Sequence, residues 1–298
     1  MKRLLIVIFA CSAMLSATAQ HYLGADIAGC FAWQHDRLDF TKPNLAGGGS
    51  AGALYEYQVR HLLIQTGVGA ALTWTSMSVT ESPLEYRMID SEGIAFVYRG
   101  IIQNRNDRAR MFELQVPLRL GVEYSYFYAL AGARFALNLS TAARSTAMLK
   151  TTGDYGDRYY EQLEDMPNHG FHDFEAVGST SRLRFRPDLR VEAELGGNIP
   201  ISARNTIAPK LRLGVFFSYG VLNVLNASGD TSMSEADLSN HLQLTLNHVY
   251  ASRESLSTPV NNLQTGIRLT FLFPVGDTKD NKKAYLKILY PCRCEKLQ

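Results

Sequence analysis

The segment from residue 112 to residue 124, FELQVPLRLGVEY, alternates strictly between apolar and polar positions. Every even-numbered position is apolar, from Phe112 to Tyr124, and every odd-numbered position is charged, polar, glycine or proline. A period of two predicts a β-strand with two unlike faces. The run exceeds the usual soluble strand of about 5–6 residues, and it is long enough for a tilted strand that crosses a membrane, which needs about 9–11 residues.

Seven further segments repeat this alternation, at about residues 22–33, 47–57, 62–76, 127–140, 183–199, 210–221 and 263–273. The connections after the second, fourth and sixth segments are short, whereas those after the third, fifth and seventh are long. Short turns on one side and long loops on the other are typical of a bacterial outer-membrane barrel. We therefore predict an all-β fold over residues 20–274, an eight-stranded antiparallel up-and-down transmembrane β-barrel with short periplasmic turns and long extracellular loops.

The N-terminus falls outside the strand pattern. Residues 1–19 are predicted to be a secretory signal peptide, because Lys2 and Arg3 precede an apolar stretch and the small residues 17–19 offer a cleavage site. Cleavage before Cys11, as in a lipoprotein, is the alternative. Either form of export predicts a protein of the cell envelope.

The C-terminus also falls outside the pattern, and residues 275–298 are predicted to be a periplasmic tail. Cys292 and Cys294 lie in this tail, separated by one residue. A disulfide between them suits an oxidising compartment, although such a small ring is often strained. An incidental pair of thiols is the other interpretation.

The overall charge gives no reason to expect a nucleic-acid partner. The chain has 30 Lys and Arg against 28 Asp and Glu, a formal net charge of +2. Mean hydropathy is -0.10, which argues against a helical membrane protein. A barrel escapes this measure, because half of its positions face inward.

The inward positions of the predicted strands carry many charged side chains. We assign fifteen of them to the lumen: Asp26, Glu56, Glu113, Arg119, Glu123, Arg134, Arg184, Arg186, Asp188, Arg190, Glu192, Glu194, Lys210, Arg212 and Arg268. An eight-stranded barrel is just wide enough for side chains to fill its interior. Because acidic and basic groups nearly balance, we expect an interlocked ion-pair network and no open diffusion pore. A proton or ion path through these charges is the alternative.

Candidate catalytic chemistry is sparse. His169 and His172, with Asp165, Asp173 and Glu175, could supply a base or hold a metal weakly, but a solvated external loop explains the same composition. The sequence has no G-x-S-x-G, H-E-x-x-H, P-loop or dinucleotide fingerprint. We therefore expect a protein that is not an enzyme and has no catalytic residue, metal or cofactor. A lipid-active outer-membrane enzyme is the alternative.

The segment VPLRLGVEYSYFYALAGARFALNLS, residues 116–140, resembles outer-membrane β-barrel proteins of the PorT-like family. That family tends to show an x-Pro-Leu strand, a tight turn and an aromatic strand containing Ala-Gly. The closing segment GIRLTFLF, residues 266–273, is similar to the family's last strand. The resemblance covers about residues 21–274 and implies an eight-stranded outer-membrane barrel, with a role in protein secretion in one branch.

These observations predict an integral protein of the cell outer membrane that acts as an envelope or surface component. The role would be structural, binding, or accessory to transport or protein secretion. We expect outer-membrane lipid as a partner, and envelope or secretion proteins reached through the aromatic-rich loops or the basic tail. A small-solute or ion channel is the remaining alternative.

Overall fold

The structure is a computed structural model that describes residues 19–80, 83–89, 93–156, 173–177, 181–201, 209–225, 232–237, 243–253 and 258–275. Residues 1–18 of the predicted signal peptide, residues 276–298 of the predicted tail with Cys292 and Cys294, and the loop residues His169 and His172 lie outside these ranges.

Eight long strands form the body of the protein: β1 (Ala19–His35), β3 (Ala46–Val59), β4 (Leu62–Val79), β6 (Ala95–Tyr124), β7 (Phe127–Asp154), β10 (Asp188–Pro200), β11 (Lys210–Gly220) and β14 (Asn261–Val275). Each pairs antiparallel with the long strands before and after it in the chain, and β1 pairs with β14 to close the ring. The chain is therefore an eight-stranded up-and-down β-barrel, as the alternation and loop lengths predict. Within the described residues, no helix has the length and apolar character needed to cross a membrane.

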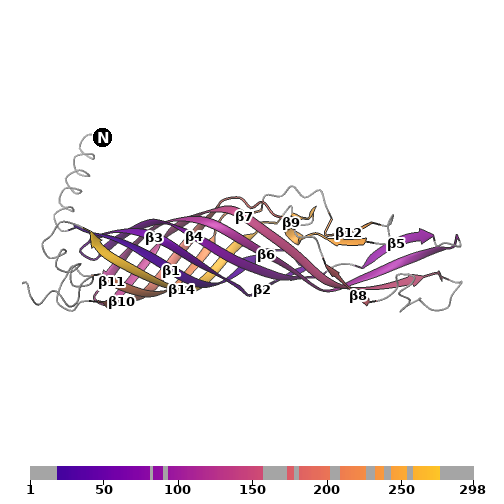
Figure 1. Cartoon of the computed structure of the whole chain (residues 1–298), viewed down its shortest axis with the longest axis horizontal. Helices are drawn as coiled ribbons and strands as arrows, with labels where there is room; N and C mark the ends of the chain where they lie inside the picture. Colours follow the sequence, from indigo (N-terminus) through magenta and orange to yellow (C-terminus); the bar gives the residue numbers. More distant parts are fainter. Residues whose placement is uncertain are drawn as a thin grey trace, which may run out of the picture.

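The two ends of the barrel differ in their connections. At one end, which we call the turn end, Arg60 and Ser125 adopt φ angles of 54° and 56° in two-residue turns between β3 and β4 and between β6 and β7. At the other, the loop end, the barrel is extended by shorter elements: β2 (Thr41–Asn44), β5 (Leu84–Ile89), β8 (Asp173–Val177), β9 (Ser181–Arg182), β12 (Ser234–Asp237), β13 (Gln243–Leu246) and the 3-10 turn η3 (Val249–Ala251). The result is an elongated molecule, with β5, β8 and β12 at the end far from the barrel (Figure 1).

The predicted boundaries were wrong for the two strands that border the first two long loops. Residues 78–110 and 141–181 were expected to be loops, but β6 begins at Ala95 and β7 continues to Asp154. The pairing between them shifts at Asn104, which has a φ of 52°, and again beside Phe112. The second shift places Ser140 on the exposed outer face, whereas the alternation predicted for residues 127–140 turns the even-numbered positions, Ser140 among them, inward.

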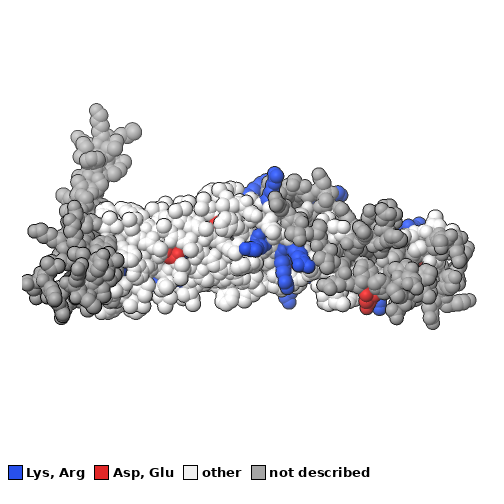
Figure 2. All heavy atoms as spheres, in the orientation of Figure 1, with Lys and Arg blue, Asp and Glu red and all other residues white. Residues whose placement is uncertain are grey.

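The outer face of the barrel is apolar over a limited height. On β6, the outward residues from Phe112 to Val122 are exposed and apolar, as are Phe135 and Leu137 on β7. We call this surface the apolar belt. Figure 2 shows it as a nearly uncharged surface over the barrel, with basic side chains gathered where it ends.

The sense of the alternation inverts above the apolar belt. Within the belt, apolar side chains point outward and polar ones inward, as for Phe112 and Glu113 on β6. Immediately above it, Met111 and Ala109 are buried while Arg110 is exposed. Strand β4 changes in the same way, because Met77 and Val79 are buried there. The loop end therefore has apolar side chains inside and polar ones outside, as in a water-soluble β-structure. The belt has the opposite, inside-out arrangement.

Candidate functional site in the barrel lumen

Thirteen of the fifteen charged residues assigned to the lumen lie inside the barrel and form ion pairs there. They fall into three clusters along the axis, which we call the turn-end, central and loop-end clusters. Successive strands supply them because each inward position is followed two residues later by another on the same face. Strand β10 alone contributes Asp188, Arg190, Glu192 and Glu194, which descend from the loop end toward the turn end.

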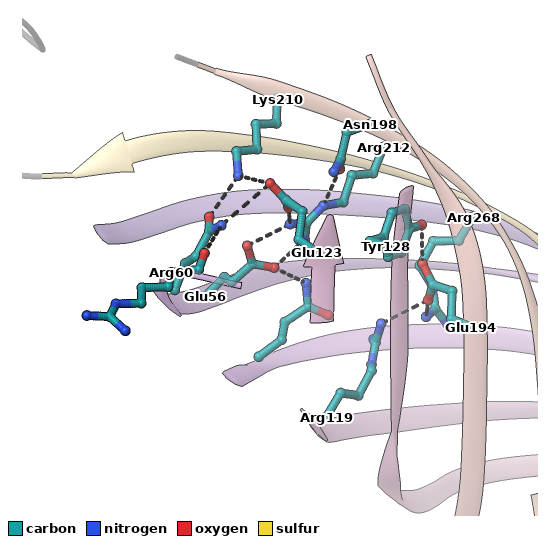
Figure 3. A network of polar contacts seen from close by, with 12 residues as sticks. Glu56, Arg60, Arg119, Glu123, Tyr128, Glu194, Asn198, Lys210, Arg212 and Arg268 are labelled. Atoms are coloured by element: carbon teal, nitrogen blue, oxygen red, sulfur yellow. Dashed lines mark hydrogen bonds and ion pairs between the residues drawn. The ribbon is translucent and has the colours of Figure 1, made fainter. Parts of the chain in front are cut away.

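The turn-end cluster joins Glu56, Glu123, Lys210 and Arg212. Arg212 contacts Glu56 with both terminal nitrogens, the Nη2–Oε1 distance being 2.9 Å, and it also contacts Glu123. Lys210 Nζ lies 2.6 Å from Glu123 Oε1 and donates to Gln58 Oε1 at 2.7 Å. These groups come from β3, β6 and β11, and Figure 3 shows the labelled side chains pointing toward one another. Two carboxylates and two cations make the cluster formally neutral.

The central cluster is built around Arg268 on β14. Its Nη1 lies 2.6 Å from Glu192 Oε1 and also contacts Glu194, and its Nε lies 3.3 Å from Asp26 Oδ2. Arg119 approaches Glu194 with an Nη1–Oε2 distance of 3.2 Å, and Arg134 contacts Glu192. Three carboxylates face three guanidinium groups, so this cluster is also neutral.

The loop-end cluster contains Glu113, Asp188 and Arg190. Arg190 Nε donates to Asp188 Oδ2 at 2.7 Å, and its Nη2 contacts Glu113. Asn262 donates to the same Asp188 oxygen at 3.2 Å. Two carboxylates against one cation give this layer a formal charge of -1, which the amide donors partly offset.

Aromatic rings separate the charged layers. The Arg212 guanidinium lies 5.0 Å from the ring centroid of Tyr128, and that of Arg268 lies 4.6 Å from the centroid of Phe216. Tyr128 also donates its hydroxyl to Glu194 Oε1 at 2.6 Å. These contacts hold the flat faces of the guanidinium groups while carboxylates satisfy their edges.

Arg184 and Arg186 were wrongly assigned to the lumen, because both side chains are exposed. The predicted strand began at residue 183, whereas β10 begins at Asp188, directly after Pro187. Leu183 and Phe185 instead pack inward above the barrel. Here, too, the alternation has inverted above the apolar belt. Without these two residues, the lumen holds seven acidic and six basic groups, a formal charge of -1.

Above the lumen, the loop end is closed by an apolar cluster, which we call the cap. Its buried members are Met77, Val79, Val224, Leu225, Val249, Tyr250 and Val260. The residues come from β4, from the segment after β11, from η3 itself and from the residue before β14. The cap therefore places packed apolar side chains on the loop-end side of the charged lumen.

Sequence reasoning missed a buried polar group at the edge of the cap. Arg105 and Asp107 pair with an Nε–Oδ1 distance of 2.9 Å, and both are fully buried. Asp107 also accepts from the backbone N–H of Val249 at 2.7 Å. Burial lowers the pKa of nearby His248 to about 4. Both residues of the pair lie in what was expected to be a loop, so the period of two was not followed to their positions.

The lumen has little empty space beside the central cluster. A cavity bordered by Asp26, Arg119 and Arg134 measures about 20 Å³, which is room for a single water molecule. Among the described residues, no group of His, Cys, Asp and Glu has the arrangement needed to hold a metal ion. The geometry therefore describes a polar interior that is packed.

No protein-family model matches the chain, and its sequence matches no curated protein. Solved structures with a similar outline include Neisserial surface protein A (11% identity, 84% of this chain and 97% of that chain, TM-score 0.30) and Ail, the attachment invasion locus protein of Yersinia pestis (10%, 85% and 99%, 0.29). The translocator domain of autotransporter NalP from Neisseria meningitidis also aligns (7%, 91% and 97%, 0.21). The assignment of the fold depends on the strand pairing itself.

Proposed function

We propose that the chain is an integral outer-membrane β-barrel that acts as a sealed envelope or surface component, and that it is neither an open channel nor an enzyme. The observation that carries this proposal is the inside-out apolar belt. Ten residue steps separate Phe112 from Val122. At about 3.3 Å per residue and a strand tilt of about 40°, they rise about 25 Å, the height of the apolar band of outer-membrane barrels.

Aromatic residues at both borders support a position across a bilayer. Tyr124, Tyr126 and Phe127 are exposed at the turn end, and Trp74 is exposed at the border nearest the loop end. Aromatic side chains of this kind gather at membrane–water interfaces, because one part of the ring system is apolar and another can form hydrogen bonds. In this orientation the turn end is periplasmic and the loop end is external, as the predicted export signal requires.

The sealed lumen supports a role without conduction. Three ion-pair clusters and the aromatic rings between them occupy the axis, and the cap covers their loop end. Moving an ion through this interior would require separating buried pairs, which costs several kcal/mol for each ion left without a partner, about 3–5 kcal/mol.

Planar-bilayer recording of the folded, full-length protein tests this function. We expect no steady single-channel steps across the membrane at moderate voltage, while an open porin in the same bilayers conducts. Large, steady and reproducible steps would overturn the sealed-barrel proposal. Fractionation of cells that express the chain tests the location, for which we expect recovery in the outer membrane.

Membership of the PorT-like family and an accessory role in secretion form the finer part of the proposal. They are supported by the residue 116–140 segment, with its x-Pro-Leu strand, tight turn and Ala-Gly strand. Truncation after Pro274 tests whether the tail reaches envelope partners. We expect the barrel to assemble without the tail and to lose co-purification with secretion proteins. Unchanged co-purification would reject the tail as the site of attachment.

A further inference from the structure

Three arginines stand together on the outer wall at the upper border of the apolar belt. Arg108 and Arg110 are exposed on β6, and Arg144 is exposed on β7. Arg108 lies directly opposite Arg144 in the strand register, and Arg110 lies opposite Trp74 of β4. The three side chains therefore share one patch on the adjacent strands β6 and β7, next to Trp74 of β4.

The patch is hollowed into a groove of about 560 Å³. Leu45, Trp74 and Ser76 line it together with Arg108, Arg110 and Arg144, and none of its lining residues is acidic. The groove lies on the outside of the barrel wall, so it is separate from the charged lumen.

The groove carries the positive charge of its three arginines. Within the described part of the chain, none of the three arginines forms an ion pair, whereas Arg99, farther along β6, pairs with both Glu85 and Asp154. Like charges directly opposite each other on neighbouring strands are destabilising. Arg108 and Arg144 are such a pair, so an anion seated between them would relieve their repulsion.

The surroundings of the groove specify the kind of anion. Immediately below the arginines the apolar belt begins, with Phe112 on β6 and Leu139 on β7, both exposed. Trp74 lies at the same border. A ligand that matches both the arginines and the apolar belt below them carries a negative headgroup and an apolar tail. Guanidinium groups match phosphate oxygens with paired donors, which favours phosphate over other headgroup anions.

We propose that this groove binds the phosphate-bearing headgroup of an anionic membrane lipid, with its acyl chains lying along Phe112 and Leu139. The inference rests on the proposed function, because it requires the apolar belt to be in a bilayer. This site would bind one lipid specifically, whereas the other lipids around the barrel make no specific contacts. It would also fix the depth of the barrel relative to the phosphate layer of the membrane.

The test uses the full-length barrel in nanodiscs of phosphatidylcholine with a minor fraction of phosphatidic acid, and it measures retention of each lipid by native mass spectrometry. The test variant is Arg108→Gln with Arg144→Gln. The matched control is Arg37→Gln with Arg184→Gln, which removes the same charge from exposed loop-end positions outside the groove. Since the test variant removes two basic residues from beside the anionic headgroup, we expect it to lose at least tenfold in preference for phosphatidic acid.

A charge-retaining variant, Arg108→Lys with Arg144→Lys, should keep most of the preference and thereby separate loss of charge from loss of folding. Inorganic phosphate added in excess should leave the retained lipid in place, because it cannot replace the acyl contacts. Equal retention of phosphatidic acid by the wild type and the test variant would overturn the inference, as would complete displacement by inorganic phosphate. In either case a normally inserted barrel would leave the proposed function intact, whereas a chain that stays outside lipid would overturn both.

Discussion

Removal of Arg268 is the most informative single change in the lumen. This side chain is 1% exposed and contacts Asp26, Glu192 and Glu194. Replacement by Met keeps most of the volume but leaves these three carboxylates with two partners, Arg119 and Arg134. The central cluster then changes from neutral to a formal charge of -1 in a buried site.

Breaking a buried ion pair by removing one partner costs about 3–5 kcal/mol, because the remaining charge stays buried without compensation. We therefore expect Arg268→Met to lower the free energy of unfolding by about this amount. The matched control is Arg99→Met at the loop end, where Arg99 and Glu85 side chains are 36% and 60% exposed. Exposed pairs contribute about 0–1 kcal/mol, so the control should change little.

The double variant Arg268→Met with Glu194→Gln separates charge from packing. In this double variant the central cluster again has equal numbers of negative and positive groups, namely two carboxylates and two guanidinium groups. We expect it to be more stable than Arg268→Met alone by at least ~1 kcal/mol, within the range for directly interacting residues. Equilibrium urea unfolding in lipid vesicles, followed by tryptophan fluorescence, measures all three differences. A cost for Arg268→Met no larger than that for Arg99→Met would refute the buried network.

Two further changes test the cap and the close approach of strands. Because burial lowers the pKa of His248 from 6.5 to about 4, the folded cap excludes the protonated form. The cap should therefore keep its full stability above about pH 6.5 and lose it as the pH falls toward 4. Amide hydrogen exchange of residues 249–252 should become faster as this stability is lost, and His248→Asn should abolish the pH dependence. An unchanged pH dependence in that variant would contradict the assignment of the effect to His248. At Gly132, an added Cβ would lie 2.1 Å from Leu118 O, whereas at Gly29 it would meet nothing within 4 Å. Gly132→Ala should reduce the yield of folded barrel in a heat-mobility assay and Gly29→Ala should not; equal yields would contradict the close packing of β6 and β7.

Much of the barrel was predictable because its two faces meet different surroundings. The belt segment of β6 meets apolar surroundings on one side and a charged interior on the other, so Phe112 to Tyr124 show a clean period of two. The short turns and long loops then predict the number of strands and their order. The same alternation of inward and outward positions predicts the thirteen charged residues that lie in the lumen.

The shortened β6 and the misplaced Arg184 and Arg186 share one physical cause, which is the inversion of the alternation above the belt, whereas the error at Ser140 comes from the register shift beside Phe112. Strand β6 was cut short because Arg108 and Arg110 point outward there and Ala109 points inward, opposite to the rule that holds lower on the strand. The same inversion misplaced Arg184 and Arg186. The bulge at Asn104, where φ is 52°, shifts the parity once more. Each of these changes depends on the position along the strand at which its surroundings change. The local pattern of apolar and polar residues does not give that position.

The central claim is that one strand face meets lipid only within the belt, while the other face meets a sealed interior. Single cysteines at positions Phe135, Ala136, Leu137 and Arg144, in a background without Cys30, Cys292 and Cys294, test it directly on one strand of the barrel in vesicles. A thiol-reactive fluorophore should label positions 135 and 137 and be quenched there by acyl-chain spin labels. It should label position 144 without such quenching, and it should leave position 136 unreacted until the protein is unfolded. Equal labelling of positions 135 to 137, or lipid quenching at position 144 as strong as at 137, would contradict the account.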